Sequence, residues 1–422
     1  MKEDAKKQIF AGIDIGTTKV CAIIAEWSED KPIKILGIGQ SQSVGLNRGI
    51  VNDINETVSA IEKAVLEAES QSGYKIESAY VGITGEHIRG INNTGVVTVS
   101  KTNTRIPTDQ EITENDIQRV LDHAQSITLP QERRILHILS QEFKIDDHSG
   151  IKNPLGMSGH RLEARVHLVT SGKTVEKNLK TCMDKAGIEV TGFVLEPLAS
   201  AFALLDPNEK KLGVALLDIG GGTTDVIVYY DNGVHHTGVI PFGGNSITND
   251  IAHGVQTTVE QAEELKCKYG SCKGALASEE ELISIKGIGG RGEKTMSPRK
   301  LASFIEPRMK EIFTFANSEI HKSDYRGSFT FGIVITGGGS LLNNVEDLAQ
   351  EIFRQPIKIG IPTEVDGIAD KIQDPIYSTA VGLIHYAIYN RDAVEDISSW
   401  GNGFPIIGKI INKIKNFFGN LY

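Results

Sequence analysis

A short Asp-Ile-Gly motif followed by hydroxyl-bearing residues occurs twice in this chain, each time directly after an apolar, strand-like run. The first copy spans residues 14–19 (Asp-Ile-Gly-Thr-Thr-Lys) and the second spans residues 218–225 (Asp-Ile-Gly-Gly-Gly-Thr-Thr-Asp). A glycine-rich turn lets backbone N–H groups approach an anion closely, because no Cβ intervenes and positive φ is allowed. One copy alone is more often an ordinary turn. Two copies predict a polyphosphate held from both sides in a cleft between two related lobes, with an aspartate beside each turn for hydrated Mg²⁺.

The composition is that of an ordinary multidomain protein. The chain has 422 residues, of which 40% are hydrophobic and 23% charged, enough for two or more domains. Its net charge of −10 argues against a general nucleic-acid binder. The sequence contains no apolar signal segment and no run of about 20 apolar residues, so we expect neither secretion by that route nor a spanning helix. The four cysteines lack the pairing of a zinc site and are typical of a reducing cytoplasm.

Strands that alternate with helices predict an α/β fold with partly parallel sheets. Apolar runs predict strands at 9–13, 20–25, 33–38, 79–84, 188–195, 214–217 and 331–336. Helical spacing predicts helices at 54–68, 175–186, 198–205, 247–253, 259–268, 298–322 and 378–389. Pro307 would kink the long helix or divide it. Between about 85 and 165 the pattern changes to a small α+β insertion, in which residues 113–116 resemble a capping box.

The order of these motifs resembles that of the actin/Hsp70/sugar-kinase superfamily. Two phosphate hairpins, a glycine turn at 336–342 and two connecting helices at 196–205 and 378–389 follow one another as that superfamily requires. The resemblance covers nearly the whole chain to about residue 390. It implies an actin-like, two-lobed ATPase fold that binds ATP and Mg²⁺ in the cleft.

The same resemblance implies roles for the residues of the two hairpins. Their backbone N–H groups would hold the phosphates, at Gly16, Thr17, Thr18, Gly221, Gly222 and Thr223. Asp14 and Asp218 would hold Mg²⁺ through water, although capping a turn is the ordinary use of such an aspartate. Lys19 would reach a phosphate, unless it is simply solvated.

Further residues are assigned to the rest of the nucleotide. Gly338, Gly339 and Ser340 would lie close to the adenosine, where bulky side chains would exclude the ring. Glu263 and Lys266 match the superfamily's helix over the ribose and base, although such a run alone is more often a solvated helical face. Glu196 is the candidate for orienting a hydrolytic water, the alternative being a polar turn residue. No histidine occurs in these motifs, so we expect at most slow hydrolysis, used as a switch.

The end of the sequence is strongly amphipathic. After a linker at 391–403, residues 404–422 wound at about 100° per residue separate into two faces. The apolar face consists of Ile406, Ile407, Ile410, Ile411, Ile414, Phe417, Phe418 and Leu421, and the polar face carries Lys409, Lys413 and Lys415 without an acid. A helix this short is marginal in water. Each lysine gains about 1 kcal/mol near anionic lipid, so we expect reversible membrane binding by one copy and firm binding by a polymer. The alternative is a docked core helix.

The actin-like core, the insertion and the basic amphipathic end together resemble the FtsA family of bacterial division proteins. Residues 153–163 (Asn-Pro-Leu-Gly-Met-Ser-Gly-His-Arg-Leu-Glu) are similar to a run typical of that family. The resemblance implies a peripheral protein that polymerises on the inner face of the cytoplasmic membrane at the septum. It would anchor the C-terminal peptide of FtsZ there and recruit later division proteins through the insertion, named subdomain 1C. Residues 305–308 resemble the family's FtsZ-binding helix, which makes Arg308 a candidate contact.

The family's plan divides the chain as follows: subdomain 1A at 1–84 with 166–196 and about 378–390, subdomain 1C at 85–165, subdomain 2A at 197–241 and 305–377, subdomain 2B at 242–304, a flexible linker at 391–403 and an amphipathic membrane-targeting helix at 404–422.

Three alternative functions stay open. A carbohydrate kinase of the same superfamily would leave the tail unexplained. A chaperone-like ATPase would need a substrate domain after the core, and a scaffold of pili or cell shape fits the insertion and tail less well.

Overall fold

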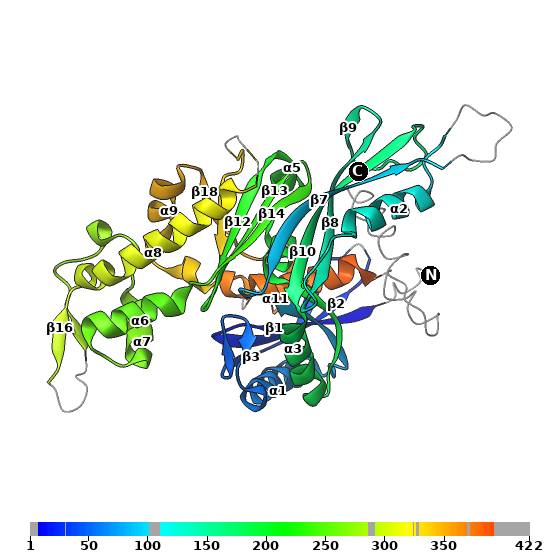
Figure 1. Ribbon diagram of the computed structural model, residues 1–422. Coiled ribbons are helices and arrows are strands. Elements are labelled where there is room, and N and C mark those ends of the chain that lie inside the picture. The colour runs from blue at the N-terminus through cyan, green and yellow to red at the C-terminus, as the bar shows by residue number, and fades with distance from the viewer. Residues whose placement is uncertain are drawn as a thin grey trace.

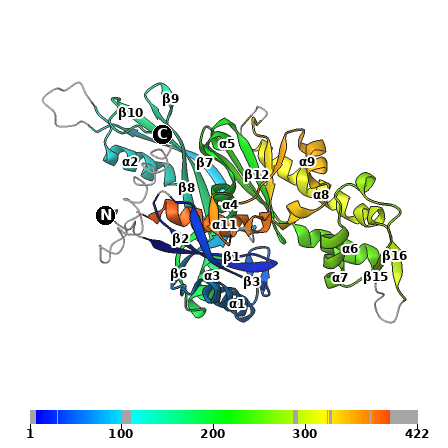
Figure 2. The ribbon, with the colours of Figure 1, turned by 180° about the vertical axis from the view of Figure 1, so that it is seen from behind.

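The computed structural model describes residues 7–29, 31–100, 110–285, 292–323, 325, 329–368 and 372–391. These residues form two lobes and an inserted subdomain, with the first lobe below, the second above and to the left, and the insertion at the upper right in Figure 1. Helices α4 and α11 lie at the centre between the lobes, as the reverse view in Figure 2 shows. The fold is therefore the predicted two-lobed α/β architecture with an α+β insertion.

The first lobe is built on one mixed sheet. Its strands are β1 (Gln8–Ile15), β2 (Lys19–Trp27), β3 (Ile33–Gln42), β6 (Ser78–Ile83), β11 (Glu189–Leu195) and β19 (Val365–Gly367). They lie in the order β11-β6-β1-β2-β3-β19, with β1, β2 and β3 antiparallel and β6 and β11 parallel to β1. Helices α1 (Ile54–Ser72) and α3 (Lys173–Lys185) pack against this sheet, and the short hairpin of β4 (Leu46–Asn47) and β5 (Ile50–Val51) leads into α1.

The second lobe repeats this topology. Its strands β12 (Val214–Ile219), β13 (Thr224–Tyr230), β14 (Gly233–Ile240), β17 (Ile333–Thr336) and β18 (Ile357–Ile359) lie in the order β14-β13-β12-β17-β18. Again the first three strands are antiparallel and the last two run parallel to the first. Helix α5 (Pro207–Leu212) precedes this sheet, and α9 (Val345–Phe353) lies between β17 and β18 in the sequence. The two sheets therefore place β1 and β12 in equivalent positions.

The helical part of the second lobe contains α6 (Gly244–Val255), α7 (Val259–Tyr269), the short helix η1 (Gly274–Leu276), the hairpin of β15 (Ile283–Ile285) and β16 (Lys294–Met296), and α8 (Pro298–His321). Helix α8 runs through Pro307 as one helix. Pro307 is exposed, so the carbonyl of Ser303 that loses its N–H partner faces water, while Ile305 and Met309 are buried in the core. Burial on one face thus outweighs the single missing hydrogen bond.

The insertion consists of β7 (Arg89–Thr98), α2 (Glu114–Gln125), β8 (Arg133–Ile145), β9 (His148–Ile151) and β10 (Arg161–Gly172). Its sheet has the order β7-β10-β8-β9, and α2 packs on it around the buried Phe143 and Leu162. The predicted capping box is present, because the Thr113 side chain accepts from the Asp116 N–H and Asp116 accepts from the Thr113 N–H. Strands β7, β8 and β10 lie against β14 of the second lobe, as Figure 1 shows.

Two helices join the lobes. Helix α4 (Glu196–Leu204) follows β11 directly, and α11 (Ser378–Tyr389) follows the short helix η3 (Pro375–Tyr377). They contact each other closely, since a Cβ on Gly382 would lie 1.9 Å from the Ala199 carbonyl oxygen. Their apolar residues share one core with side chains from both sheets. This shared core joins the two lobes.

Candidate nucleotide site

The two Asp-Ile-Gly motifs form equivalent hairpins. In the first, the Gly16 N–H donates to the Lys19 carbonyl at 3.0 Å, and in the second, the Gly220 N–H donates to the Thr223 carbonyl at 3.0 Å. Each hairpin links the first two strands of its sheet, β1 to β2 and β12 to β13. The predicted phosphate turns therefore share one backbone geometry.

The hairpins face each other at close range. A Cβ on Gly221 would lie 1.8 Å from the Thr18 Oγ1, and one on Gly222 would lie 2.5 Å from the Thr17 Oγ1. A Cβ at either position would force the facing threonine side chain to move, so glycine is the residue that fits both positions without rearrangement. The structure thus brings Gly16, Thr17, Thr18, Gly221, Gly222 and Thr223 to one place, as the sequence predicts.

The two motif aspartates are buried beneath the hairpins. Burial raises the pKa of Asp14 to about 6, with the Lys19 ammonium lowering it and the Asp218 carboxylate raising it. Burial also raises the pKa of Asp218, against the lowering effect of hydrogen bonds from the Ser200 hydroxyl at 2.7 Å and the Thr379 hydroxyl at 3.1 Å. Ser200 belongs to α4 and Thr379 to α11, so both connecting helices hold Asp218.

Glu196 lies beside these aspartates at the start of α4. A Cβ on Gly82 would lie 3.2 Å from the Glu196 Cγ and 3.5 Å from the Asp14 Oδ1, which places both acids against the end of β6. The pKa of Glu196 is raised well above its usual range, first by burial and then by the charges of Asp14, Asp225 and Asp218. The predicted water-orienting residue is thus in the same cluster as the predicted metal-binding residues.

Asp225 is a member of this cluster that the sequence reasoning did not assign. Its carboxylate accepts a hydrogen bond from the Thr84 hydroxyl and another from the Thr223 hydroxyl at 3.3 Å. Burial raises its pKa to about 7, partly offset by the Thr84 hydrogen bond. The signal was available, because Asp225 is the one acid in the otherwise apolar, buried strand β13. In the first lobe's hairpin, Cys21 occupies the position that is equivalent to Asp225, since Asp14 pairs with Cys21 as Asp218 pairs with Asp225.

Lys19 projects from the first hairpin toward the glycine turn. Its ammonium donates to the Ile376 carbonyl and lies 4.5 Å from the centre of the Tyr377 ring. It also lowers the pKa of both Asp14 and Asp218. Lys19 is therefore a positive charge inside the carboxylate cluster and not a solvated surface lysine.

The glycine turn η2 (Gly338–Leu341) packs against the end of β12. A Cβ on Gly337, whose φ is 79°, would lie 2.4 Å from the Asp218 Oδ1, and one on Gly339 would lie 2.3 Å from the Ile219 Cγ2. A Cβ on Gly338 would meet no atom closer than 3.8 Å. Ser340 donates to the Gly337 carbonyl at 2.7 Å and is buried. Gly337 and Gly339 are thus needed by the fold, whereas the space at Gly338 is open.

Glu263 and Lys266 of α7 are connected to the second hairpin. The buried Lys266 ammonium donates to the Thr248 hydroxyl at 2.8 Å, the Gly244 carbonyl at 3.1 Å and the Glu263 carboxylate at 2.7 Å. The Gly244 N–H in turn donates to the Gly220 carbonyl at 2.9 Å. Lys266 therefore ties α7 to the first turn of α6, directly beside the hairpin.

Arg308 lies on α8, away from the hairpins. Its guanidinium forms a two-pronged ion pair with Asp250 of α6, at 2.6 and 3.1 Å, and also contacts Glu311. It lies 5.6 Å from the centre of the Phe242 ring. The predicted membrane residues of the segment 404–422, namely Ile406, Ile407, Ile410, Ile411, Ile414, Phe417, Phe418, Leu421, Lys409, Lys413 and Lys415, lie outside the described residues.

The donor set suits a hydrated divalent cation. Asp14, Glu196, Asp218 and Asp225 offer oxygen ligands, which Mg²⁺ prefers, and Lys19 offsets only part of their charge. In the described parts of the chain, no three His, Cys, Asp or Glu side chains converge to bind an ion directly. The described residues also include no helix that is long and apolar enough to cross a membrane.

Comparison with known proteins identifies the family. The model for the cell division protein FtsA matches residues 215–382, and the model for the SHS2 domain inserted in FtsA matches residues 85–170. FtsA of Pseudomonas aeruginosa is 41% identical over 397 residues, which cover 94% of this chain and 93% of that protein. The chain belongs to the FtsA family of cell division proteins. FtsA of Neisseria meningitidis is 39% identical over 91% of each chain, and FtsA of Escherichia coli is 35% identical over 90% of each.

Solved structures show that this FtsA-family chain has an actin-like fold. The type IV pilus biogenesis complex PilM–PilN matches with a TM-score of 0.63 at 16% identity, covering 90% of this chain and 98% of that chain. MreB 5 of Spiroplasma citri, in a crystal structure bound to AMPPNP, matches with a TM-score of 0.54 at 14% identity, covering 93% and 98%. The resemblance to the FtsA family and its actin-like fold, predicted from the sequence, is thus confirmed.

Proposed function

We propose that this FtsA-family protein binds ATP in the cleft between its lobes. The observation that carries the proposal is the pair of equivalent hairpins that meet above buried aspartates. Five backbone N–H groups, those of Thr17, Thr18, Gly221, Gly222 and Thr223, would hold the phosphates. The Gly16 N–H, which the sequence also assigned to this role, is already donated to the Lys19 carbonyl. Gly338 leaves space beside the glycine turn for the adenosine, with Gly339 and Ser340 shaping the turn, and Glu263 with Lys266 would border the ribose.

Mg²⁺ would be held through water by Asp14 and Asp218, and when bound it would neutralise phosphate charge. Glu196 would orient a water near the terminal phosphate. Burial and the neighbouring carboxylates raise the pKa of Glu196 and so favour its protonated form, which cannot accept a proton from water. Slow hydrolysis that acts as a switch is therefore the expected activity. The MreB 5 structure with AMPPNP supports nucleotide as the ligand of this fold.

We further propose that the chain polymerises on the inner face of the cytoplasmic membrane at the septum and anchors FtsZ there. The amphipathic segment 404–422 would bind anionic lipid. The C-terminal peptide of FtsZ would dock on the face of α8 that carries Arg308, and later division proteins would bind subdomain 1C. Membership of the FtsA family supports these roles.

ATP binding is tested by titration of a fluorescent ATP analogue with and without Mg²⁺. The Asp218→Asn variant should lose most of the Mg²⁺-dependent affinity, whereas Asp184→Asn, an exposed aspartate of α3, should keep it. Equal affinity in the two variants would contradict the proposed metal site.

Membrane anchoring is tested by co-sedimentation with anionic liposomes in the presence of ATP and Mg²⁺. The full chain should pellet with liposomes, and a chain that ends at Gly403 should remain in solution. Pelleting of both chains would place the membrane contact elsewhere. If both remain in solution and a sugar is phosphorylated, the carbohydrate-kinase alternative is correct.

A further inference from the structure

Strand β8 of the insertion touches both lobes through two residues that are four positions apart. The Nε2 of His137 accepts the backbone N–H of Leu195 at 3.0 Å, and Leu195 precedes Glu196 at the start of α4 in the first lobe's chain path. The Gln141 side-chain amide donates to the Val234 carbonyl of β14 at 2.9 Å, in the second lobe. Both side chains are buried. The strand therefore spans the distance from one lobe to the other.

Two β-bulges in β8 determine where these contacts are made. The register between β10 and β8 shifts between Arg165 and Val166, which leaves Gln141 as the extra residue, and shifts again between Val169 and Thr170, which leaves Leu136 extra. A β-bulge bends its strand and redirects the side chain that it carries. Gln141 is thereby turned toward β14, and Leu136, next to His137, packs on the first lobe's core and on the core that both lobes share.

The contact with the second lobe is a complete polar network. The Asn92 side-chain oxygen accepts from the Gln141 amide at 3.1 Å and lies 2.6 Å from the His167 Nδ1, while the Asn92 amide donates to the His235 carbonyl at 3.1 Å. Because that oxygen is an acceptor, the His167 Nδ1 carries the proton. The neutral ring then accepts the Thr237 hydroxyl at its Nε2, at 2.9 Å. Every member of this set thus has a partner across or beside the interface.

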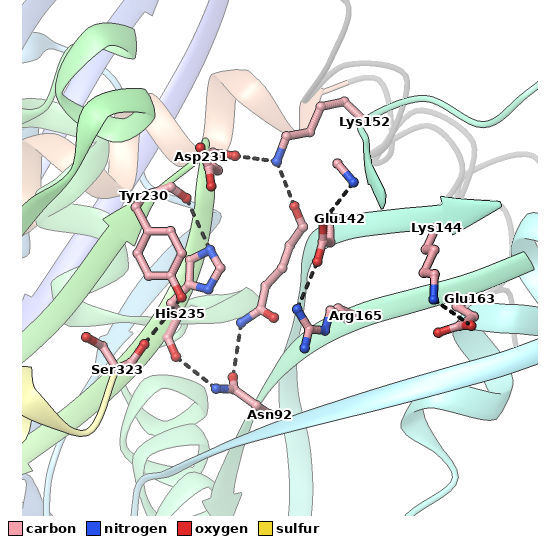
Figure 3. A network of polar contacts seen from close by, with 12 residues as sticks. Asn92, Glu142, Lys144, Lys152, Glu163, Arg165, Tyr230, Asp231, His235 and Ser323 are labelled. Carbon is pink, nitrogen blue, oxygen red and sulfur yellow. Dashed lines mark hydrogen bonds and ion pairs between the residues drawn. The ribbon is translucent and has the colours of Figure 1, made fainter. Parts of the chain in front are cut away.

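Lys152 adds a further link at the edge of the network. Its ammonium donates to the Gln141 carbonyl at 2.8 Å and to the Asp231 carbonyl, so it joins the insertion to the turn that precedes β14. Figure 3 shows Asn92 and Lys152 reaching from the insertion toward His235 and Asp231 of the second lobe. The strands are closely packed at Gly90, because a Cβ there would lie 2.6 Å from the Thr237 Oγ1.

We propose that β8 is a brace across the nucleotide cleft, with His137 and Gln141 as positioning residues. The brace holds β14 at a fixed distance from the start of α4, and so resists rotation of the lobes about the pair α4 and α11. It slows the opening through which nucleotide leaves. This inference rests on the proposed binding of ATP between the lobes. The hydrogen bonds are between neutral groups, apart from those of Lys152, and therefore break and re-form at modest cost.

The first test is the release rate of a fluorescent ATP analogue from the full chain, measured by stopped flow. Gln141→Ala and His137→Leu should each speed release by about 5- to 100-fold, because each leaves a buried partner without a hydrogen bond. His137→Gln restores an acceptor and should stay within about threefold of the parent rate. The matched control is Glu142→Gln on the same strand, whose carboxylate contacts Arg165 and Gly150 within the insertion, and it should release at the parent rate.

The second test is amide hydrogen exchange without nucleotide, so that the brace is examined even if ATP binding fails. Exchange should become faster at β14 and at the start of α4 in Gln141→Ala, and remain unchanged at α1. Lys152→Gln, at a less buried position, should show the same pattern more weakly. This variant tests the brace even if the variants at buried positions fail to fold. Unchanged exchange at both sites overturns the brace. If the parent chain binds no nucleotide but the variants still show the exchange pattern, the ATP site is refuted and the brace is retained.

Discussion

The hydroxyl of Thr84, at the end of β6 in the first lobe, donates a hydrogen bond to the carboxylate of Asp225 on β13 in the second lobe. Both side chains are buried, so the bond crosses the cleft in a place from which water is largely excluded. Hydrogen bonds to a charged group in such a place contribute about 1.5–3 kcal/mol. The bond exists only when the lobes are close together, and its strength therefore bears on closure.

Removing this bond should weaken nucleotide binding. We expect Thr84→Val, which keeps the shape of the side chain, to raise the dissociation constant for Mg²⁺–ATP by about tenfold or more, because closure loses a charged hydrogen bond. Isothermal titration of the variant measures the change. Thr181→Val, at a half-buried position of α3 whose hydroxyl bonds only within the helix, serves as the control. Equal affinities would mean that Thr84 does not act on closure.

The buried carboxyls predict a specific pH dependence of stability. Burial raises the pKa of Asp14 to about 6 and that of Asp225 to about 7. A carboxyl whose pKa is higher in the folded protein than in the unfolded chain binds its proton more tightly when folded. The resulting stabilisation is complete at low pH and is lost as the pH rises through about 6 to 7. Thermal unfolding of the nucleotide-free protein should therefore shift to lower temperature between pH 5.5 and 8.

Binding of Mg²⁺–ATP should change with pH in the opposite direction. The ionised forms of Asp14 and Asp218 are needed to hold a hydrated cation, so affinity should fall as the pH is lowered from 8 to 5.5. Asp225→Asn should remove the upper part of the stability dependence, near pH 7, and leave the part near pH 6. A stability profile that is flat in the parent protein would contradict the proposed burial of these charges.

The contact between the hairpins predicts a mutation and its suppressor. Gly221→Ala places a methyl group 1.8 Å from the Thr18 Oγ1 and should destabilise the protein by about 1–3 kcal/mol, as overpacking does. Adding Thr18→Ala removes the clashing oxygen, and the double variant should recover at least half of the loss. Urea unfolding of the single and double variants measures the coupling. Additive effects would show that the hairpins do not touch.

The glycine turn allows fold and ligand effects to be separated. Gly339→Ala would press on Ile219 and should lower stability by about 1–3 kcal/mol, whereas Gly338→Ala meets open space and should change stability by less than about 0.5 kcal/mol. If adenosine lies at this turn, Gly338→Ala should nevertheless weaken ATP binding severalfold. Unchanged affinity in that variant would remove the turn from the proposed adenosine site.

Local patterns in the sequence predicted much of the fold. The hairpins at 14–19 and 218–225 could be predicted because glycine and hydroxyl residues directly follow apolar strands, and α2 because Thr113 and Asp116 form a capping box. The sequence could not reveal that β19 joins the first lobe's sheet beside β3, because three residues carry little periodicity. Strand β14 was also missed, since two histidines and a threonine interrupt its apolar pattern. Thr237 contacts His167 of the insertion, whereas His236 contacts Glu319 of α8.

The site was predicted less completely than the fold. Residues that contact a ligand through the backbone, such as Gly221, have a recognisable motif. Residues that act through distant partners do not, and for this reason Thr84, Ser200 and Thr379 were not foreseen. Their hydroxyls converge on Asp218 or Asp225 only after the lobes have packed. Asp225 itself was visible as a lone acid in an apolar strand and was not given a role.

The repeated strand order makes the two hairpins topologically equivalent. ATP has no such repeat, so a site that binds one nucleotide between the hairpins would need to differ at equivalent positions. Cys21 and Asp225 are such a pair: a buried neutral thiol, whose pKa burial raises to about 12, stands opposite a titratable carboxyl. If nucleotide binds here as proposed, this difference would distinguish the two sides of the cleft and favour one direction of the phosphate chain.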